Sequence, residues 1–380
     1  MQQEYDIVIV GGGLVGTALA LSLANSSLSV AVVEASTEQF YLDSNDPRTF
    51  VLSLSSQRLF EKLKIWQQLE SAALPIKAVH VSEKGSFGAS RFLAAQEQVP
   101  ALGYAIGAAY LQKTLLQSIP HQTNIYFNSE LTGLVFEKNN IVKIKTPEGI
   151  KEITSKLVIG ADGTHSKTRQ LAGIAVKQWG EDYSSIVAQV EVSAPTGIAY
   201  ERFVKQGVIA MIPAINGYKL IYTLAHETAE KLATNTEQEF ITALQHQFGH
   251  RLGRLLKIGT RQLFPLQIVK AQELVRSGLV LIGNAAHTIY PLAAQGLNLG
   301  LRDVAVLAET LTQSDYDFAL LATYQQQRLP DHQATIAMTE NLLKLFTHSF
   351  FPVACGRKLA LGSFEFLPFL KHSVARRAMG

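Results

Sequence analysis

Residues 5–34 form the feature that most constrains what this chain can fold into. Residues 5–10, Tyr-Asp-Ile-Val-Ile-Val, are a short apolar run rich in β-branched side chains, which predicts a buried parallel strand. Three glycines with the spacing G-x-G-x-x-G follow, and the small residues of 17–24 predict a helix. A second apolar run, 30–33, ends on an acid. This order of strand, glycine turn, helix, strand and acid predicts a βαβ unit that binds a dinucleotide.

Each glycine of this turn has an expected role. Gly11 permits the tight turn, Gly13 lets the backbone approach a pyrophosphate, and Gly16 lets the helix pack close to the strand. The phosphates would lie at the helix N-terminus, where unpaired N–H groups favour negative charge. Glu34 is placed to accept hydrogen bonds from the adenosine ribose hydroxyls. The alternative is a glycine-rich turn of an ordinary α/β protein, and the turn alone does not choose between NAD and FAD.

Three further motifs narrow the choice. Residues 157–163 predict a strand that closes on an acidic turn. Residues 279–287 predict another strand and turn, and the chain continues from there into the glycine-containing segment 295–303. The loop after the second strand carries Asp-Pro-Arg at 46–48. In this order and over most of the chain, the motifs resemble those of the class A flavoprotein aromatic hydroxylases, the para-hydroxybenzoate hydroxylase-like group. The resemblance is closest to the ubiquinone-biosynthesis hydroxylases, in particular 2-octaprenyl-6-methoxyphenol hydroxylase.

The resemblance implies the fold and the chemistry. The fold would be α/β, with a Rossmann-like FAD-binding domain, an interleaved β-sheet substrate domain and a helical C-terminus. FAD would be the cofactor, NAD(P)H the transient reductant, and O₂ and a lipophilic phenol the substrates. The implied reaction is hydroxylation of the aromatic ring of a polyprenylated phenol in ubiquinone biosynthesis, through a C4a-hydroperoxyflavin.

We expect the two domains to be interleaved along the chain. The alternating apolar pattern of 185–192 and 217–224 predicts half-buried antiparallel strands, with one helix over about 236–248 between the strands of that region. The predicted division is 1–73, 105–176 and 268–335 for the FAD-binding domain, 74–104 and 177–267 for the β-sheet substrate domain, and 336–380 for the helical C-terminal segment.

The resemblance also implies the site residues. Arg48 and Pro291 would lie beside the flavin ring as catalytic residues, where a cation stabilises the negative charge of the reduced flavin. The predicted cofactor-binding residues are Gly11, Gly13, Gly16, Glu34, Arg48, Gln112, Asp162, Gly163, Gly283, Asn284, Gln295, Gly296, Leu297 and Asn298. Simpler alternatives remain for three of them. Arg48 could cap the helix that begins near Ser53 or Ser55, Gln112 could be a solvated helix residue, and Asp162 could bond its own turn.

Three positions depart from the family pattern. Asn284 stands where aspartate is common, Tyr290 where histidine is common, and Ala294 where glycine is common. An asparagine keeps an acceptor oxygen, so FAD binding is still expected. A methyl group at Ala294 would narrow the approach to the flavin if that position needs a positive φ.

Composition excludes several other classes of protein. The 380 residues contain one cysteine, Cys355, which rules out an intrachain disulfide and a multi-cysteine metal site. The histidine spacing predicts no metal site, and the formal charge of +3 does not predict nucleic-acid binding. No secretory signal begins the sequence and no apolar run of about 18 residues occurs, so we expect a cytoplasmic protein.

The C-terminal composition and the departures leave alternatives open. From Asn341 onward six basic residues stand against the single acid Glu365, among many leucines and phenylalanines. This segment predicts contact with the inner membrane surface or with other quinone-biosynthesis proteins, and the alternative is packing on the FAD domain. The function could also be hydroxylation of another aromatic compound, flavin-dependent reduction of prenyl chains, or that of a catalytically weak FAD-bound component of a biosynthetic complex.

Overall fold

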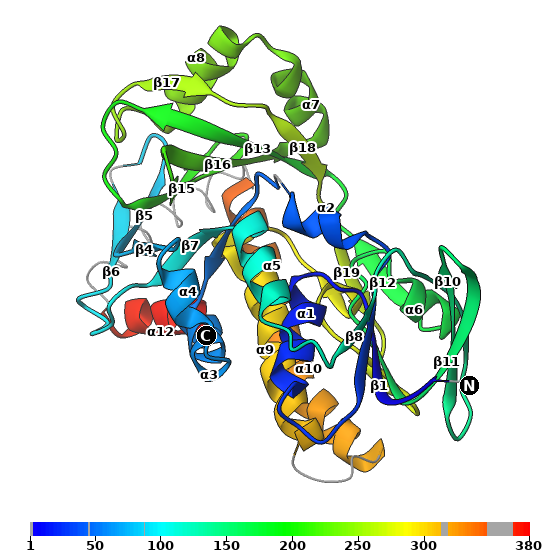
Figure 1. Cartoon of the computed structure of the whole chain (residues 1–380). Helices are drawn as coiled ribbons and strands as arrows, with labels where there is room; N and C mark the ends of the chain where they lie inside the picture. The colour runs from blue at the N-terminus through cyan, green and yellow to red at the C-terminus, as the bar shows by residue number, and fades with distance from the viewer. Residues whose placement is uncertain (1–2, 45, 87, 313–317, 348–367) are drawn as a thin grey trace.

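Two eight-stranded sheets form the two layers of the molecule (Figure 1). The computed structural model describes residues 3–44, 46–86, 88–312, 318–347 and 368–380. The first sheet carries the glycine turn, and the second sheet lies across from it at the top of Figure 1.

The first sheet is built around β1, the strand that precedes the glycine turn. Its neighbours in the sheet are β2 on one side and β11 on the other, and both are parallel to it. Side chains from the middle of these strands, such as Ile7, Ile9 and Val158, are fully buried, because a parallel sheet is covered on both faces. The strands are β20 (Val275–Arg276), β21 (Leu279–Leu281), β11 (Gly149–Gly160), β1 (Gln3–Val10), β2 (Val30–Val33) and β8 (Asn124–Tyr126) in spatial order, with β10 (Asn140–Thr146) and β9 (Glu130–Val135) branching from β11.

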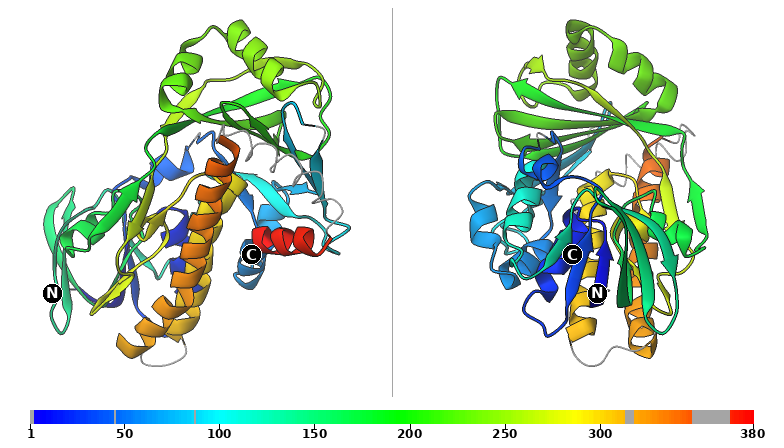
Figure 2. Two further views of the ribbon diagram at one scale, coloured as in Figure 1. Left: turned by 180° about the vertical axis from the view of Figure 1, so that it is seen from behind. Right: turned by 45° about the vertical axis from the view of Figure 1, so that its right-hand side comes forward.

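Helices cover the first sheet. The helix α1 begins directly after the glycine turn and packs against α9, and α10 runs alongside α9 over most of its length (Figure 2). These helices are α1 (Leu14–Leu23), α5 (Ala108–Gln117), α9 (Gln295–Thr312) and α10 (Phe318–Thr347).

The second sheet is antiparallel except for one strand pair, β14 with β5. Its alternation is regular: in β16, Tyr218, Leu220 and Tyr222 pack into one apolar core with Phe240 and Phe248 of α8. The intervening residues face the first layer. The strands are β17 (Leu255–Ile258), β13 (Tyr183–Val192), β16 (Gly217–Ala225), β15 (Gly207–Ala214), β14 (Ala199–Val204), β5 (Ala78–Glu83) and β6 (Ala89–Leu93) in order, with β18 (Gln262–Pro265) also on β13.

Two helices cover this core, where the sequence predicted one. The predicted helix is α8 (Glu237–Phe248), and a second helix, α7 (His226–Thr234), precedes it. The second helix has nine residues, which is shorter than the window of about 11 residues over which a helical apolar pattern is recognised.

Short elements join the two layers. They include two three-stranded sheets, β3 (Thr49–Leu52) with β7 (Gly103–Gly107) and β4 (Leu74–Ile76), and β12 (Val176–Trp179) with β19 (Ile268–Ala271) and β22 (His287–Thr288). The remaining short elements are α2 (Glu38–Leu42), α3 (Leu54–Lys62), α4 (Trp66–Glu70), α6 (Lys167–Leu171) and the 3₁₀ turns η1 (Gly283–Ala285) and η2 (Leu292–Ala294).

The predicted helical C-terminus is confirmed. The expected start at 336 lies inside the continuous helix α10, and a last helix, α12 (Pro368–Met379), returns to the first layer, where Ala375 and Met379 are buried. Residues 348–367, including Cys355 and many of the apolar residues noted above, lie outside the described part. No helix of the described residues is both long and apolar enough to cross a membrane.

Candidate active site

The glycine turn has the geometry of a phosphate cradle. Gly11 has φ +107°, and a Cβ there would lie 2.5 Å from the carbonyl oxygen of Ala161. A Cβ at Gly16 would collide with the carbonyl of Gly11, so both positions require glycine. Gly13 is the N-cap of α1, no side chain caps this helix end, and a Cβ there would meet no atom within 4 Å. The first N–H groups of α1 are therefore open to an anion.

Glu34 and Gln112 hold the glycine turn in place through hydrogen bonds to its backbone. The Glu34 carboxylate accepts hydrogen bonds from the backbone N–H of Gly12 at 2.6 Å and of Ser36 at 2.7 Å. The side-chain amide of Gln112 donates to the carbonyl of Gly12 at 2.9 Å and to the hydroxyl of Thr17 at 3.2 Å. Gln112 is buried, so the alternative of a solvated helix residue is wrong.

The third motif forms a tight turn followed by a helix start. Gly283 has φ +55°, and its N–H donates to the Asp303 carboxylate at 3.1 Å. Pro291 caps η2, and α9 begins at Gln295, as the sequence predicted for a loop that leads into a helix. Ala294, at the end of η2, has φ +51°, the left-handed conformation that glycine adopts without strain.

Two predicted cofactor residues of this motif hold the loop itself. The Asn298 side chain accepts hydrogen bonds from the Ser53 backbone and the Ser56 hydroxyl and donates to the carbonyls of Val51 and Ala294, all between 2.7 and 2.9 Å. The Gln295 amide donates to the Ala378 carbonyl of α12 at 3.2 Å. Both side chains are buried. These hydrogen bonds hold the start of α9 against β3, α3 and α12.

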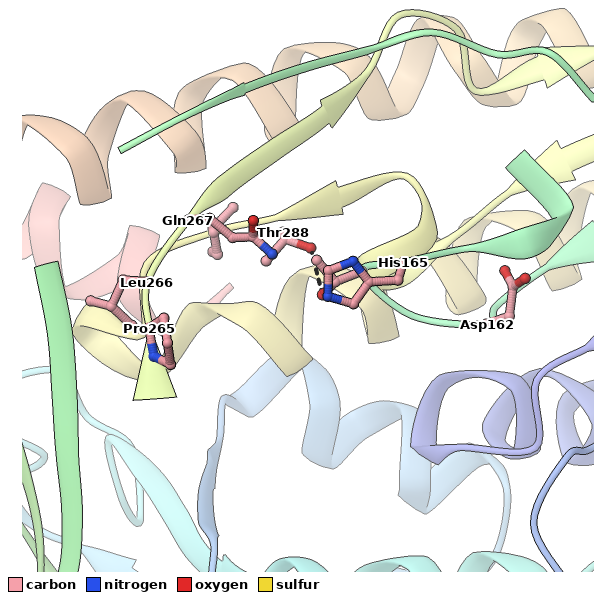
Figure 3. A pocket seen from close by; sticks show the side chains of 8 residues that line it. Asp162, His165, Pro265, Leu266, Gln267 and Thr288 are labelled. Atoms are coloured by element: carbon pink, nitrogen blue, oxygen red, sulfur yellow. Dashed lines mark hydrogen bonds between the residues drawn. The ribbon is translucent and has the colours of Figure 1, made fainter. Parts of the chain in front are cut away.

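Asp162 caps a helix. Its carboxylate accepts hydrogen bonds from the hydroxyls of Ser166 and Thr168 and from the Thr168 N–H, at 2.5 to 2.9 Å. These partners lie at the start of α6 and not in the backbone of the turn itself, so Asp162 bonds the next element, and its role toward the cofactor stays a prediction. Asp162 also borders a pocket of about 360 Å³, with His165, Gln267 and Thr288 (Figure 3).

Arg48 pairs with a neighbouring acid. Its guanidinium lies 2.6 Å from the Asp46 carboxylate, its side chain is 53% exposed, and it stacks over Phe50. Burial would raise the pKa of Asp46, but hydrogen bonds from Arg48 and the charges of Arg48 and Lys219 hold that pKa below its usual range. The helix cap suggested as an alternative is made by the Ser53 hydroxyl, which accepts from the Ser56 N–H.

These residues meet in one cleft of about 1130 Å³ between the two layers. From the first layer and its loops, Gly13, Arg48, Gln112, Gly163, Asn284, Pro291, Ala294, Gly296 and Leu297 line it. The cleft lining does not include the predicted residues Gly11, Gly16, Glu34, Asp162, Gly283, Gln295 and Asn298, of which Asp162 borders the smaller pocket instead. From the second sheet and the residue after β18 come Ser185, Val187, Ile212, Lys219, Ile221, Gln262, Phe264 and Leu266.

Lys219 is a residue that sequence reasoning missed. It is almost fully buried and lines the cleft from β16. Its signal in the sequence was a lysine inside the apolar run 218–224, in the phase opposite to the core residues of that strand.

A buried cluster behind the third motif was also missed. His287 and His332 each place Nε2 at 2.7 Å from the Asp303 carboxylate, and Nε of Arg328 lies at 2.7 Å from it. These histidines and the acid could be read as metal ligands. The Arg328 guanidinium already occupies the Asp303 oxygen that faces His332, so we assign a hydrogen-bond network. Burial lowers the pKa of His332 to about 4 despite Asp303, so His332 is uncharged at neutral pH.

Comparisons with known proteins concern the chain as a whole and show its family. The family model described as an FAD binding domain matches residues 4–339. Ubiquinone hydroxylase UbiL of Rhodospirillum rubrum is 33% identical, over 99% of this chain and 89% of that protein. The 3-demethoxyubiquinol 3-hydroxylase of Escherichia coli is 30% identical, over 100% of this chain and 99% of that protein.

Solved structures share the fold. The crystal structure of p-nitrophenol 4-monooxygenase PnpA from Pseudomonas putida has a TM-score of 0.83 at 16% identity and covers 100% of this chain and 99% of that chain. The predicted FAD-binding fold, with its interleaved sheet, is confirmed by this likeness. Because the family model spans most of the chain and its glycine cradle fits a pyrophosphate, the chain belongs to the FAD-dependent aromatic monooxygenases that share this FAD-binding domain.

Proposed function

We propose that this protein hydroxylates the aromatic ring of a polyprenylated phenol in ubiquinone biosynthesis, as 2-octaprenyl-6-methoxyphenol hydroxylase does. The observation that carries the proposal is the cleft, which has a cofactor-binding wall on one side and a mostly apolar sheet on the other. Two relatives with hydroxylase names in this pathway cover nearly the whole chain and support the choice of substrate.

The first wall of the cleft suits FAD. When bound, FAD supplies the two-electron chemistry and the activation of O₂ that hydroxylation needs. We infer that the open N-terminus of α1 at Gly13 holds the pyrophosphate and that Gly296 and Leu297 at the start of α9 present backbone N–H groups to the ring. Arg48 and Pro291 flank the ring end of the same wall. Gly11, Gly16 and Glu34 shape the turn, and Gly283 and Asn284 form the second turn.

The second wall suits an aromatic substrate with a lipid tail. Ile212, Ile221 and Phe264 present apolar surface that holds a ring and keeps water out. Phe264 is also 36% exposed, so this apolar surface reaches the outside of the molecule. A prenyl tail can leave the cleft along it.

We infer that NAD(P)H approaches through the smaller pocket of Figure 3. This pocket shares Leu266 and Ile289 with the cleft, so it adjoins the cofactor site. His165, Gln267 and Thr288 offer hydrogen-bonding groups there. Changing His165 to alanine should raise KM for NADPH in steady-state kinetics while the bound FAD stays stoichiometric.

A peripheral contact with the inner membrane surface is part of this proposal. The outer face of α12 exposes Phe369 and Val374 together with Arg376 and Arg377, which combines apolar and basic groups. Flotation with anionic phosphatidylglycerol vesicles tests it, with a Phe369→Ser, Arg376→Gln, Arg377→Gln variant as the comparison. Equal recovery of wild type with anionic and neutral vesicles contradicts the membrane contact, and contact with other quinone-biosynthesis proteins is then the remaining proposal for this face.

The decisive experiment is mass spectrometry of quinone intermediates in cells that lack this protein. An accumulating phenol identifies the ring position, and its disappearance on complementation confirms the activity. Purified protein with stoichiometric FAD should oxidise NADPH faster when a prenylated phenol is added. Stoichiometric FAD with no phenol stimulation and no accumulating intermediate instead identifies an FAD-bound assembly component.

A further inference from the structure

Lys219 of β16 projects into the cleft from the second sheet. Its neighbours along the strand, Tyr218 and Leu220, pack into the core on the other face, so Lys219 and Ile221 face the first layer. The Lys219 side chain is 4% exposed, and Ile212 lies directly opposite it in β15. An ammonium group therefore stands in a mostly apolar wall.

This ammonium has no close partner. Within the described part of the chain, no hydrogen bond and no ion pair within 4.0 Å is formed by Lys219. The acid that acts on it from across the cleft is Asp46, whose carboxylate is already engaged by Arg48 through three hydrogen bonds of 2.6 to 3.0 Å. Burial lowers the pKa of Lys219, and the charge of Asp46 raises it again. A cation that is poorly hydrated and has no protein partner among the described residues is costly, so a bound anion would be stabilised here.

The rest of that wall selects the shape of the anion. Among the described residues that line the cleft, Lys219 is the charged side chain that the second sheet contributes. Around it the sheet offers Val187, Ile212 and Ile221. A flat apolar molecule with a single acidic oxygen complements this surface.

We propose that Lys219 binds the phenolic oxygen of the substrate and holds it as the phenolate. This inference rests on the proposed function and names a residue that determines specificity at the same site. The phenol releases its O–H proton to solvent water, and the electron pair of that bond stays on the oxygen beside the ammonium. The negative charge makes the ring richer in electrons, which favours attack on an electrophilic oxygen.

The test measures binding of 2-geranylphenol and of its O-methyl ether to the FAD-loaded protein, by the change in flavin absorbance. Between about pH 7 and 9, below the ordinary pKa of a phenol and of a lysine, the affinity of wild type for the phenol should rise up to about tenfold per pH unit. The ether cannot ionise, so its affinity should stay level.

Other groups near the cleft titrate or carry charge as well. Asp43, Asp46 and Arg48 face Lys219 from the opposite loop, and Glu191 on β13 and Glu201 on β14 lie on the same face of its sheet. Because the ether meets the same groups as the phenol, the difference between the two ligands isolates ionisation of the phenol.

Variants separate the role of Lys219 from a structural one. Lys219→Met should lose the pH-dependent gain in phenol affinity and keep its FAD, and Lys219→Arg should retain part of the gain. The matched control is Lys257→Met, which removes the same side chain from an exposed position of β17 and should behave as wild type.

Two results would overturn the proposal in different ways. If wild type hydroxylates the phenol while Lys219→Met keeps the same pH dependence of binding, Lys219 has no such role and the proposed function stands. If wild type neither binds nor hydroxylates 2-geranylphenol or longer prenylated phenols, the proposed function fails and the assignment of Lys219 fails with it.

Discussion

The backbone of Ala294 is strained at the entrance to α9. Its φ of +51° costs an L-residue about 1 kcal/mol, and the Asn298 amide holds the Ala294 carbonyl at 2.8 Å in this conformation. Ala294→Gly should therefore raise the free energy of unfolding by about 0.5 kcal/mol, after allowance for the entropy of glycine in the unfolded chain. FAD should bind at least as tightly, because a methyl group that borders the cleft is removed. Urea unfolding and FAD titration measure both effects.

The same substitution within α9 gives a control of opposite sign. Ala305→Gly lies in the helix interior and should lower the free energy of unfolding by about 1 kcal/mol. If both glycine variants are destabilised equally, Ala294 is not strained.

At this scale the sequence predicted the positions that depend on local backbone. Gly11 and Gly16 need glycine as expected, because one turn and one helix decide their surroundings, whereas the role of Gly13 toward a pyrophosphate stays a prediction. Lys219 and Asp303 escaped prediction, because their meaning depends on residues far along the chain. A lysine within a strand is common, and only the arrangement of the opposite layer shows that Lys219 has no ion-pair partner in the described part of the chain.

Two long helices are joined by one buried acid. Asp303 of α9 bonds His332 and Arg328 of α10 and also the N–H of Gly283 in the cofactor turn. Burial would raise the pKa of Asp303, but the histidines beside it hold that pKa well below its usual range. The position of α10 is thereby linked to the turn that carries Asn284.

This cluster predicts a pH dependence of stability. The native pKa of His332, about 4, lies below the ordinary value of 6.5. Below pH 6.5 the unfolded chain therefore binds a proton at this histidine, whereas the native protein binds it only near pH 4. The stabilisation from a neutral His332 is complete above pH 6.5 and is lost as pH falls toward 4. In this window His332→Gln should reduce the slope of unfolding free energy against pH by up to about 1.4 kcal/mol per unit. Urea unfolding at a series of pH values measures the slope, and equal slopes would contradict the assignment.

The last helix, α12, supports the side of the cleft that we propose for the cofactor. Met379 of α12 is buried against the first layer, and the Ala378 carbonyl accepts the Gln295 amide at the start of α9. Met379→Ala should lower the free energy of unfolding by about 2 kcal/mol and reduce the bound FAD. Phe369→Ala on the same helix removes a side chain that is 82% exposed, and should change stability by less than about 0.5 kcal/mol. Calorimetry and the flavin-to-protein absorbance ratio compare the two variants, and equal losses would show that α12 does not support the site.

Element prediction succeeded where an apolar pattern was strong. The strands β1 and β2 and the last four residues of β11, 157–160, contain short apolar runs and were found, whereas α7, which has only nine residues, was not. The interleaved division into FAD-binding and substrate segments stays a prediction. The predicted domain boundary at 336 does not coincide with the end of an element, because α10 continues through it.

At the scale of the whole molecule, the cleft depends on how the two layers are fixed to each other. Tyr290, which precedes Pro291 in the cofactor wall, donates its hydroxyl to the Gly180 carbonyl at 2.9 Å. Gly180 lies between β12 and β13, where the chain passes into the second sheet. Tyr290 thus fixes the crossover between the two layers, and no local sequence pattern could reveal this contact because Gly180 lies 110 residues away.

A double-mutant cycle tests whether the contact between Tyr290 and Gly180 fixes the two layers to each other. Gly180 has φ +86°, and a Cβ there would collide with the Tyr290 hydroxyl, so Gly180→Ala should cost more than about 2 kcal/mol of stability. Tyr290→Phe should cost about 1 kcal/mol, the worth of one hydrogen bond. The two changes together should cost at least about 1 kcal/mol less than their sum, because removing the hydroxyl relieves part of the collision.

The same variants predict a functional effect, because the second sheet positions the substrate over the cofactor wall. In Gly180→Ala a looser junction should lower the amount of hydroxylated phenol formed per NADPH oxidised, with a smaller change in the rate of NADPH oxidation itself. Tyr290→Phe should show the same uncoupling more weakly. Product analysis beside NADPH consumption measures the ratio. If the effects on stability are additive and the amount of hydroxylated phenol per NADPH is unchanged, other contacts hold the two layers in place. A contact between Tyr290 and Gly180 that positions the substrate must affect both the stability and this ratio.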